Sequence, residues 1–246
     1  MRTTKETKQH AKAASEIPKN AKVKDVCWVF GPSALSQFVY KHVETTAVDI
    51  MHCLANMVKK LGFLWFDSQN HDEPYSLTKF LHIINKRILN IRPLYSTVRH
   101  PRTLTDISYW KASELKLFLS IYSIPVLCDL MDPTYFNHHK LIVYAFYLLN
   151  QTSISEEDRD DASKLIEEYV SQFNILYGDK DMTCVLHTLR HLPEVVKRLG
   201  PLCTTSCFRF KNANGVLKNF VQETKYAELQ ICSSVSLFLN YCELKE

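Results

Sequence analysis

Glycine is scarce in this sequence, with 5 residues in 246. Tight β-hairpin turns depend on glycine, so a fold built from many short strands is disfavoured. Leucine, lysine, glutamate and tyrosine are common, and hydrophobic residues make up 46% of the chain, which is ample for a buried core. The composition therefore favours helix and argues against an all-β protein.

Long hydrophobic runs are also missing. The longest unbroken apolar stretch, Leu141 to Leu149, is about half the length that a membrane-spanning helix requires. The N-terminus has no apolar segment of the kind found in secretory signals. We expect a soluble nuclear or cytoplasmic protein with no membrane partner.

The sequence contains no Cys-x-x-Cys pair and lacks the dense cysteine spacing of a secreted disulfide scaffold. Four of its cysteines, Cys53, Cys128, Cys184 and Cys232, lie among apolar residues. We expect these four to be small core side chains in a reducing compartment. A glycine-rich phosphate loop, a nucleophile elbow and a Ser/His/Asp arrangement are absent as well, so we expect no small-molecule substrate.

Basic charge is concentrated at the N-terminus. Residues 1–25 contain seven Lys or Arg against three Asp or Glu, and the rest of the chain has 23 of each kind. Two interpretations stay open: a polar tail in solvent, or an arm that contacts nucleic-acid phosphates in a salt-sensitive manner.

Apolar residues recur at helical spacing along most of the chain. The pattern predicts helices at residues 4–15, 45–65, 77–91, 111–130, 133–149, 155–177, 182–199, 212–223 and 226–241. Pro125 should kink or split its helix, and the helix that Pro133 opens should be buried on most sides. We expect a mainly α fold, a multi-helical domain with a looser N-terminal segment. Its parts would be a basic polar arm and extended segment (1–45), a two-helix linking region (46–108) and a multi-helical domain (109–246).

Eight short motifs follow one another along the chain. They are Val48–Cys53, Trp65–His71, Trp110–Glu114, Ser153–Asp158, Leu176–Gly178, Met182–His191, Gly200–Leu202 and Phe208–Gly215. In this order they resemble the C-terminal region of CACTA (En/Spm-type) transposases, over nearly the whole chain from about Arg2 to about Phe220. Any one motif is weak, and it is the set in register that is specific.

The resemblance implies the helical insertion domain and final helix of an RNase H-like transposase, without most of its β core. Such enzymes hold two Mg²⁺ ions with two Asp and one Glu. Both Asp positions would lie upstream of Met1, and the Phe-x-Phe-Glu string of relatives reads Phe208-Arg209-Phe210-Lys211 here. A lysine cannot ligate Mg²⁺ and would repel it. We therefore expect no catalysis by this chain alone, although Lys211 could also be a plain surface residue at a helix start.

Two pairs of histidines lie close together in the sequence. His187 and His191 are four residues apart, so they would share one face of a helix and could reach one metal ion. In related recombinases a Cys-x-x-Cys pair joins such histidines on a structural zinc, and that pair would also lie upstream here. We expect no cofactor, and zinc only if such a pair is supplied; two histidines that pack or hydrogen-bond without metal are the alternative. His138 and His139 have no partner pattern and are expected to be surface or core-edge residues.

Three functions remain open. A transposase remnant would bind DNA or another transposase subunit, with Lys59, Lys60, Lys86 and Arg87 as nucleic-acid-binding residues, although scattered basic residues are also typical of solvated faces. A host-adopted helical module would bind another protein without any role for DNA. An intact enzyme would require an upstream segment with the missing Asp and Cys residues, and Lys211 argues against it.

Overall fold

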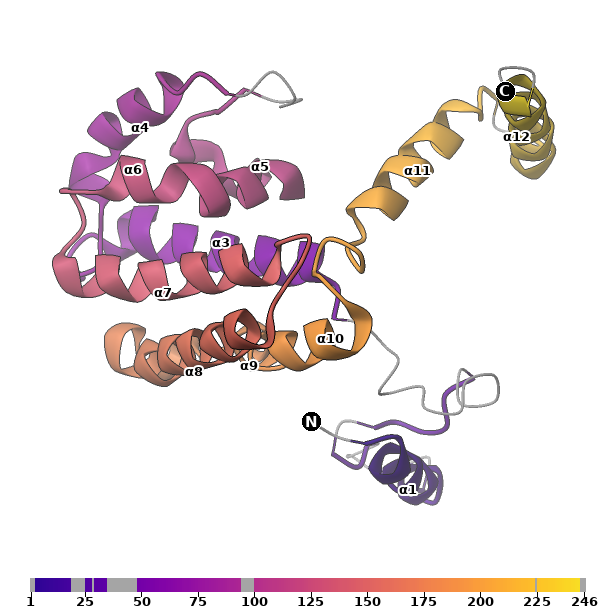
Figure 1. Ribbon diagram of the computed structural model, residues 1–246, viewed down its shortest axis with the longest axis horizontal. Helices are drawn as coiled ribbons and strands as arrows, with labels where there is room; N and C mark the ends of the chain where they lie inside the picture. Colours follow the sequence, from indigo (N-terminus) through magenta and orange to yellow (C-terminus); the bar gives the residue numbers. More distant parts are fainter. Residues whose placement is uncertain are drawn as a thin grey trace. The chain divides into compact units, whose positions relative to one another are not determined.

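The computed structural model describes residues 3–18, 25–27, 29–34, 48–93, 100–223 and 225–243. In these ranges the chain is mainly helical and contains no strand (Figure 1). The one pairing of β type that they contain is a bridge between Val26 and Val29. The predicted mainly α class is confirmed. Much of the extended segment expected before residue 45 lies outside the described residues, and the boundaries at 45 and 108 stay predictions.

The chain divides into two units, Met1–Thr205 and Ser206–Glu246. The first helix, α1 (Thr4–Ser15), has the predicted bounds and begins with a capping box. The hydroxyl of Thr3 accepts the amide N–H of Glu6, and the Glu6 carboxylate accepts that of Thr3. These reciprocal bonds satisfy two amide groups that a helix start otherwise leaves unpaired, which explains why the helix begins there.

Helix α3 (Ile50–Phe66) is an inner element of the first unit. The Asp49 carboxylate caps it by accepting the amide N–H groups of Met51 and His52. The helix packs against α5 (Ala112–Leu117), α9 (Cys184–Leu189) and the 3₁₀ helix η3 (Leu104–Tyr109). Its fully buried side chains include Leu61, Leu64 and Trp65. After the short η1 (Ser68–Asn70) and η2 (Thr78–Phe80), α4 (Leu81–Leu89) buries Ile84 and Ile88.

The helix predicted at 111–130 is split, as expected from Pro125. It consists of α5 (Ala112–Leu117), a π-helical segment η4 (Phe118–Tyr122) and α6 (Ser123–Leu127). Pro125 has no amide proton, and its ring crowds the carbonyl one turn earlier, so the α-helical bonding pattern cannot continue unchanged. The distortion therefore falls just before the proline.

Among the described helices, α7 (Pro133–Leu149) and α8 (Glu156–Tyr177) form the most extensive pair (Figure 1). Each follows local signals in the sequence. Asp132 caps α7 with Pro133 in its first turn, and Ser155 forms a capping box with Asp158 at the start of α8. Gly178, at φ 89°, ends α8 in a conformation that favours glycine.

The single helix predicted at 182–199 is wrong. The structure has η5 (Asp179–Asp181), then α9 (Cys184–Leu189) and α10 (Leu192–Leu199) with a turn between them. Pro193 lies in the first turn of α10, where its missing N–H costs nothing, and it cannot extend the hydrogen bonding of α9. The proline therefore starts a second helix.

The second unit contains α11 (Phe208–Asn219) and α12 (Ala227–Glu243), near the predicted positions. No described helix is both long and apolar enough to cross a membrane. Of the four cysteines predicted to be core residues, only Cys53 is buried, whereas Cys128, Cys184 and Cys232 are exposed. Cys128 and Cys184 lie at helix ends, where the backbone turns toward solvent, so apolar neighbours in sequence did not imply burial.

Candidate functional site

The rings of His187 and His191 face each other across the break between α9 and α10. Their Nε2 atoms are 3.2 Å apart, and the ring centroids are 4.8 Å apart at 83°. The sequence predicted that both residues lie on one continuous helix. They lie instead on either side of a turn, and the turn brings the two rings together. Because two neutral imidazoles can hydrogen-bond only if one nitrogen donates and the other accepts, one of the two Nε2 atoms is unprotonated.

The geometry of this pair fits a metal ion. Two tetrahedral zinc ligands with Zn–N bonds of about 2.0–2.1 Å are separated by roughly 3.3 Å, close to the observed Nε2 separation. Burial and the neighbouring His187 lower the pKa of His191, which favours the neutral form that a metal requires. Among the described residues no group of three His, Cys, Asp or Glu side chains gathers. The described pair therefore offers two ligands, and the expectation of no cofactor, with zinc only if a Cys pair is supplied, stays a prediction.

Lys211 lies in the first turn of α11. Its amide N–H donates to the carbonyl of Cys207 at 2.8 Å, and its side chain is exposed. The string Phe208–Lys211 thus opens α11, four residues before the start predicted for this helix. At this end of a helix the macrodipole favours an anionic side chain and disfavours a cation. The lysine is therefore not explained by helix stability.

The four basic residues predicted to bind nucleic acid have different surroundings. Lys59 and Lys86 are exposed. Lys60 donates to Asp181, whose carboxylate is almost fully buried. Removal of Lys60 would leave a buried carboxylate without its counter-ion, which is strongly destabilising. Lys60 therefore already neutralises a charge within the protein.

Arg87 is also engaged within the protein. Its guanidinium donates to both carboxylate oxygens of Asp129, at 2.7 and 3.0 Å, and to the carbonyls of Val126 and Cys128, at 3.2 and 2.8 Å. These carbonyls lie at the end of α6, where the last residues of a helix have unpaired acceptors. Arg87 thus joins α4 to the end of α6, and Lys59 and Lys86 are the more accessible candidates for phosphate contacts.

The prediction that His138 and His139 are surface or core-edge residues is wrong. Both side chains are buried, at 2% and 1% exposure. His138 stacks on Tyr169 of α8, and His139 lies edge-on to Trp65 of α3. A signal for this was present in the sequence. Both lie at helical spacing from Ile142, which is itself in the core. The aromatic partners that cover them, Tyr169 and Trp65, lie on other helices, and the pattern along a single helix does not identify them.

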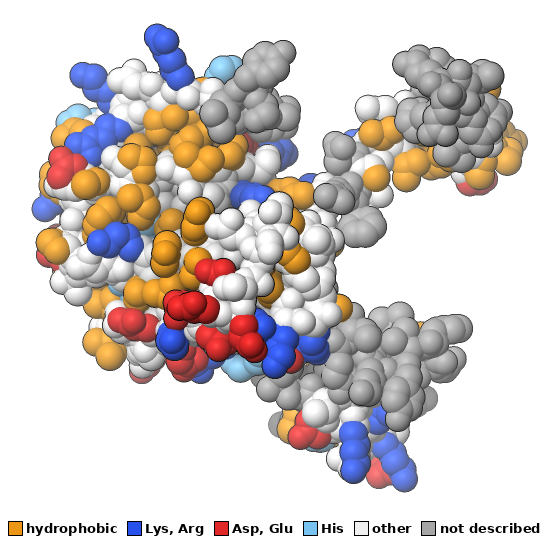
Figure 2. All heavy atoms as spheres, viewed as in Figure 1, with side chains coloured by type: hydrophobic (Ala, Val, Ile, Leu, Met, Phe, Trp, Pro, Cys, Tyr) orange, Lys and Arg blue, Asp and Glu red, His pale blue; other side chains and the backbone are white. Residues whose placement is uncertain are grey.

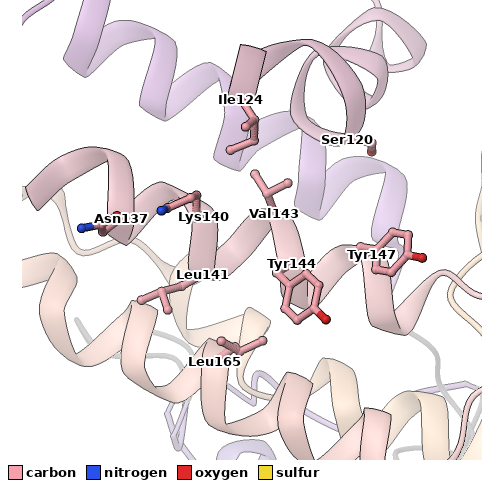
Figure 3. Close-up of a pocket in the computed structure, with 9 residues that line it drawn as sticks. All are labelled: Ser120, Ile124, Asn137, Lys140, Leu141, Val143, Tyr144, Tyr147 and Leu165. Carbon is pink, nitrogen blue, oxygen red and sulfur yellow. The ribbon is translucent and has the colours of Figure 1, made fainter. Parts of the chain in front are cut away.

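Helix α7 also has an open face, although it was predicted to be buried on most sides. A groove of about 650 Å³ runs along it (Figure 3). Its lining consists of Ser120, Ile124, Asn137, Lys140, Leu141, Val143, Tyr144, Tyr147 and Leu165. Tyr144 and Tyr147 are 55% and 61% exposed, and their rings stack with centroids 6.0 Å apart at 11°. Sequence reasoning missed this groove because tyrosines in an apolar run resemble core residues.

No protein family, curated protein or solved structure matches this chain. The fold and the site define a mainly helical protein with a facing histidine pair and an exposed aromatic groove.

Proposed function

We propose that this chain is a transposase-derived helical domain that binds DNA or a transposase subunit and does not cut or join DNA by itself. Two features support the proposal. The eight ordered motifs resemble the C-terminal region of CACTA transposases, and the position expected for the metal-binding Glu holds Lys211, exposed in the first turn of α11. The lysine is the observation that carries the loss of activity.

A lysine at this position opposes catalysis by its charge. Attack on a phosphodiester by a two-metal mechanism needs several carboxylates that hold both cations close together. An ammonium group at one of these positions supplies no ligand and adds like-charge repulsion toward Mg²⁺. Residues 1–246 would therefore act in transposition only through binding.

A plasmid-nicking assay tests this proposal. Purified protein with Mg²⁺ or Mn²⁺ should leave supercoiled DNA intact, and Lys211→Glu should not restore cleavage because it supplies one of three carboxylates. Metal-dependent nicking that co-purifies with the protein would refute the proposal.

DNA binding is tested separately. Affinity for duplex DNA should fall steeply with salt, because phosphate contacts release counter-ions. The double variant Lys59→Ala/Lys86→Ala should bind more weakly and with a smaller salt dependence, by about one unit of slope for each phosphate that the variant no longer neutralises. Lys197→Ala, at an exposed lysine of α10, is the matched control. If the unaltered protein, the double variant and Lys197→Ala bind DNA equally, Lys59 and Lys86 do not contact it.

A second function, that of a host-adopted module for binding another protein, is favoured by the groove on α7. Exposed, stacked tyrosines suit an interaction surface, because burial of aromatic rings is a main source of binding energy. Partner binding that persists at high salt, together with no shift of DNA in a gel, would distinguish this function from the first.

A further inference from the structure

The groove on α7 has three walls of different origin. Leu141, Tyr144 and Tyr147 form its α7 wall, Leu165 of α8 lies on one side, and Ile124 of α6 lies on the other. Figure 3 shows Ile124 facing Val143 across one part of the groove and Leu141, Tyr144 and Leu165 gathered in another. The floor is therefore apolar and made by side chains on helices, which a partner would meet in a fixed arrangement.

The two tyrosines are already placed for contact. Tyr144 and Tyr147 are one helical turn apart, and their stacked rings restrict one another. Since ordering side chains opposes binding, rings that are held in place in the free protein favour it.

The charge beside the groove is acidic on the α8 side. Helix α8 contains seven Asp or Glu residues and two Lys or Arg. Asp161 and Glu168 lie about one turn before and after Leu165, so they share its face of the helix, and both are exposed. Asp161 is paired with Lys164 at 3.0 Å, whereas Glu168 accepts a hydrogen bond from the neutral side chain of Gln172 and keeps its charge. Figure 2 shows acidic side chains next to the hydrophobic surface. On the α7 side the groove has one cation, Lys140, whose ammonium lies 5.3 Å from the centre of the Phe136 ring.

We propose that this groove binds an amphipathic helix of a partner protein. The helix would place apolar side chains at i, i+3, i+4 and i+7 on the tyrosines and lysines or arginines along the edge that faces α8. The inference rests on the second function above, that of a binding module, and is independent of descent from a transposase. The acidic edge disfavours nucleic acid, and it disfavours a second copy of the chain, which would bring the same acidic helix.

The test begins with a defined probe. A phage library of 18-residue helical peptides, randomised at the apolar positions and along one edge, is selected on the full chain. The selected peptides are then synthesised, and their binding is measured by fluorescence polarisation. We expect enrichment of large apolar residues at helical spacing together with lysine or arginine on a single edge.

Variants then locate the binding. Tyr144→Ser/Tyr147→Ser should weaken binding by about 10-fold or more, as expected for aromatic anchors. Glu168→Lys should weaken it by roughly 3-fold or more and reduce its salt dependence. Tyr109→Ser is the matched control, since Tyr109 is 77% exposed and does not line the groove. All three variants change exposed residues, and circular dichroism with thermal unfolding verifies that each is folded.

Several outcomes would overturn the proposal. Selection could yield no binder, or peptides that bind the double tyrosine variant as well as the unaltered protein, or peptides with no basic edge. Displacement of the peptides by oligo(dT) would point to nucleic acid instead. A dimer in sedimentation equilibrium that the double tyrosine variant dissociates would identify a second copy as the occupant. The nicking assay is unaffected by any of these results, so the two proposals fail separately.

Discussion

His139 donates a hydrogen bond from Nε2 to the hydroxyl oxygen of Ser123 at 2.9 Å, and that hydroxyl donates to the carbonyl of Leu119 at 3.0 Å. Because the serine proton is committed to the carbonyl, the histidine proton must reside on Nε2. The bond connects α7 with the start of α6. The other ring nitrogen of His139, Nδ1, is buried with no hydrogen-bond partner among the described residues. Burial lowers the pKa of His139 to about 3.

His138 makes the corresponding bond to α8. Its Nε2 donates to the carbonyl oxygen of Tyr169 at 2.9 Å, and burial lowers the pKa of His138 to about 4. A second proton on either ring would place a charge in the core beside Trp65 and Tyr169 without an acceptor for it. Both rings therefore contribute to the fold in the neutral form.

The free energy of unfolding should decrease as the pH falls below 6.5. Between the ordinary histidine pKa of 6.5 and the lowered values, the unfolded chain binds protons that the folded chain excludes, so acid favours unfolding. Between pH 6.5 and 5 the expected loss is on the order of 2 kcal/mol for each histidine. Urea unfolding across this range measures it. His139→Gln, which retains a donor but does not titrate, should flatten the dependence, and His82→Gln at an exposed site should not.

Zn²⁺ should bind weakly at the His187 and His191 pair and raise the melting temperature. At a concentration 100 times its dissociation constant, a ligand of the folded state adds about 2.7 kcal/mol of stability. Binding should weaken below pH 6, because the metal requires neutral imidazole. Calorimetric titration with the protein and with His187→Ala measures this, and His52→Ala, at an exposed histidine, serves as control. Equal Zn²⁺ affinity in His187→Ala would show that the ion binds elsewhere.

Arg87→Ala should destabilise the first unit by about 1–2 kcal/mol, since it removes donors to two carbonyls at the end of α6. The ion pair with Asp129 contributes little of this, because the carboxylate is 66% exposed. Lys86→Ala, at the exposed neighbouring residue, should change stability by less than about 0.5 kcal/mol. Chemical unfolding of the two variants tests the difference. If both are neutral, the helix junction does not depend on the guanidinium.

Gly62→Ala should lower stability by about 1 kcal/mol or more despite the higher helix propensity of alanine. A Cβ atom at Gly62 would lie 2.8 Å from Cδ1 and 3.1 Å from Cγ2 of Ile107, so the buried side chain of Ile107 would have to shift. Ile107→Val removes the closer atom and should recover part of the loss in a double-mutant cycle. At Gly215 of α11, where a Cβ meets nothing within 4 Å, alanine should instead increase helix stability. A stabilised Gly62→Ala variant would contradict the close approach.

The positions of the helix ends were largely predictable from the sequence, because they depend on residues within one turn of each other. Ser155 with Asp158, Pro133 and Gly178 each act through their own backbone or a neighbouring amide. The break before Pro193 depends on an equally local signal, which the periodic apolar pattern of residues 182–199 concealed.

Tertiary structure alone decided which side chains are buried and which are paired. The sequence pattern shows that one face of a helix is apolar, but it does not show which neighbour covers that face. His138 and His139 became core residues because α7 lies between α8 and the start of α6. Arg87 pairs with Asp129, which lies 42 residues further along the chain. Tyr144 and Tyr147 are exposed because no described helix covers that side of α7. These outcomes depend on interactions between segments that are far apart in the sequence, and a local sequence pattern does not show which segments will meet.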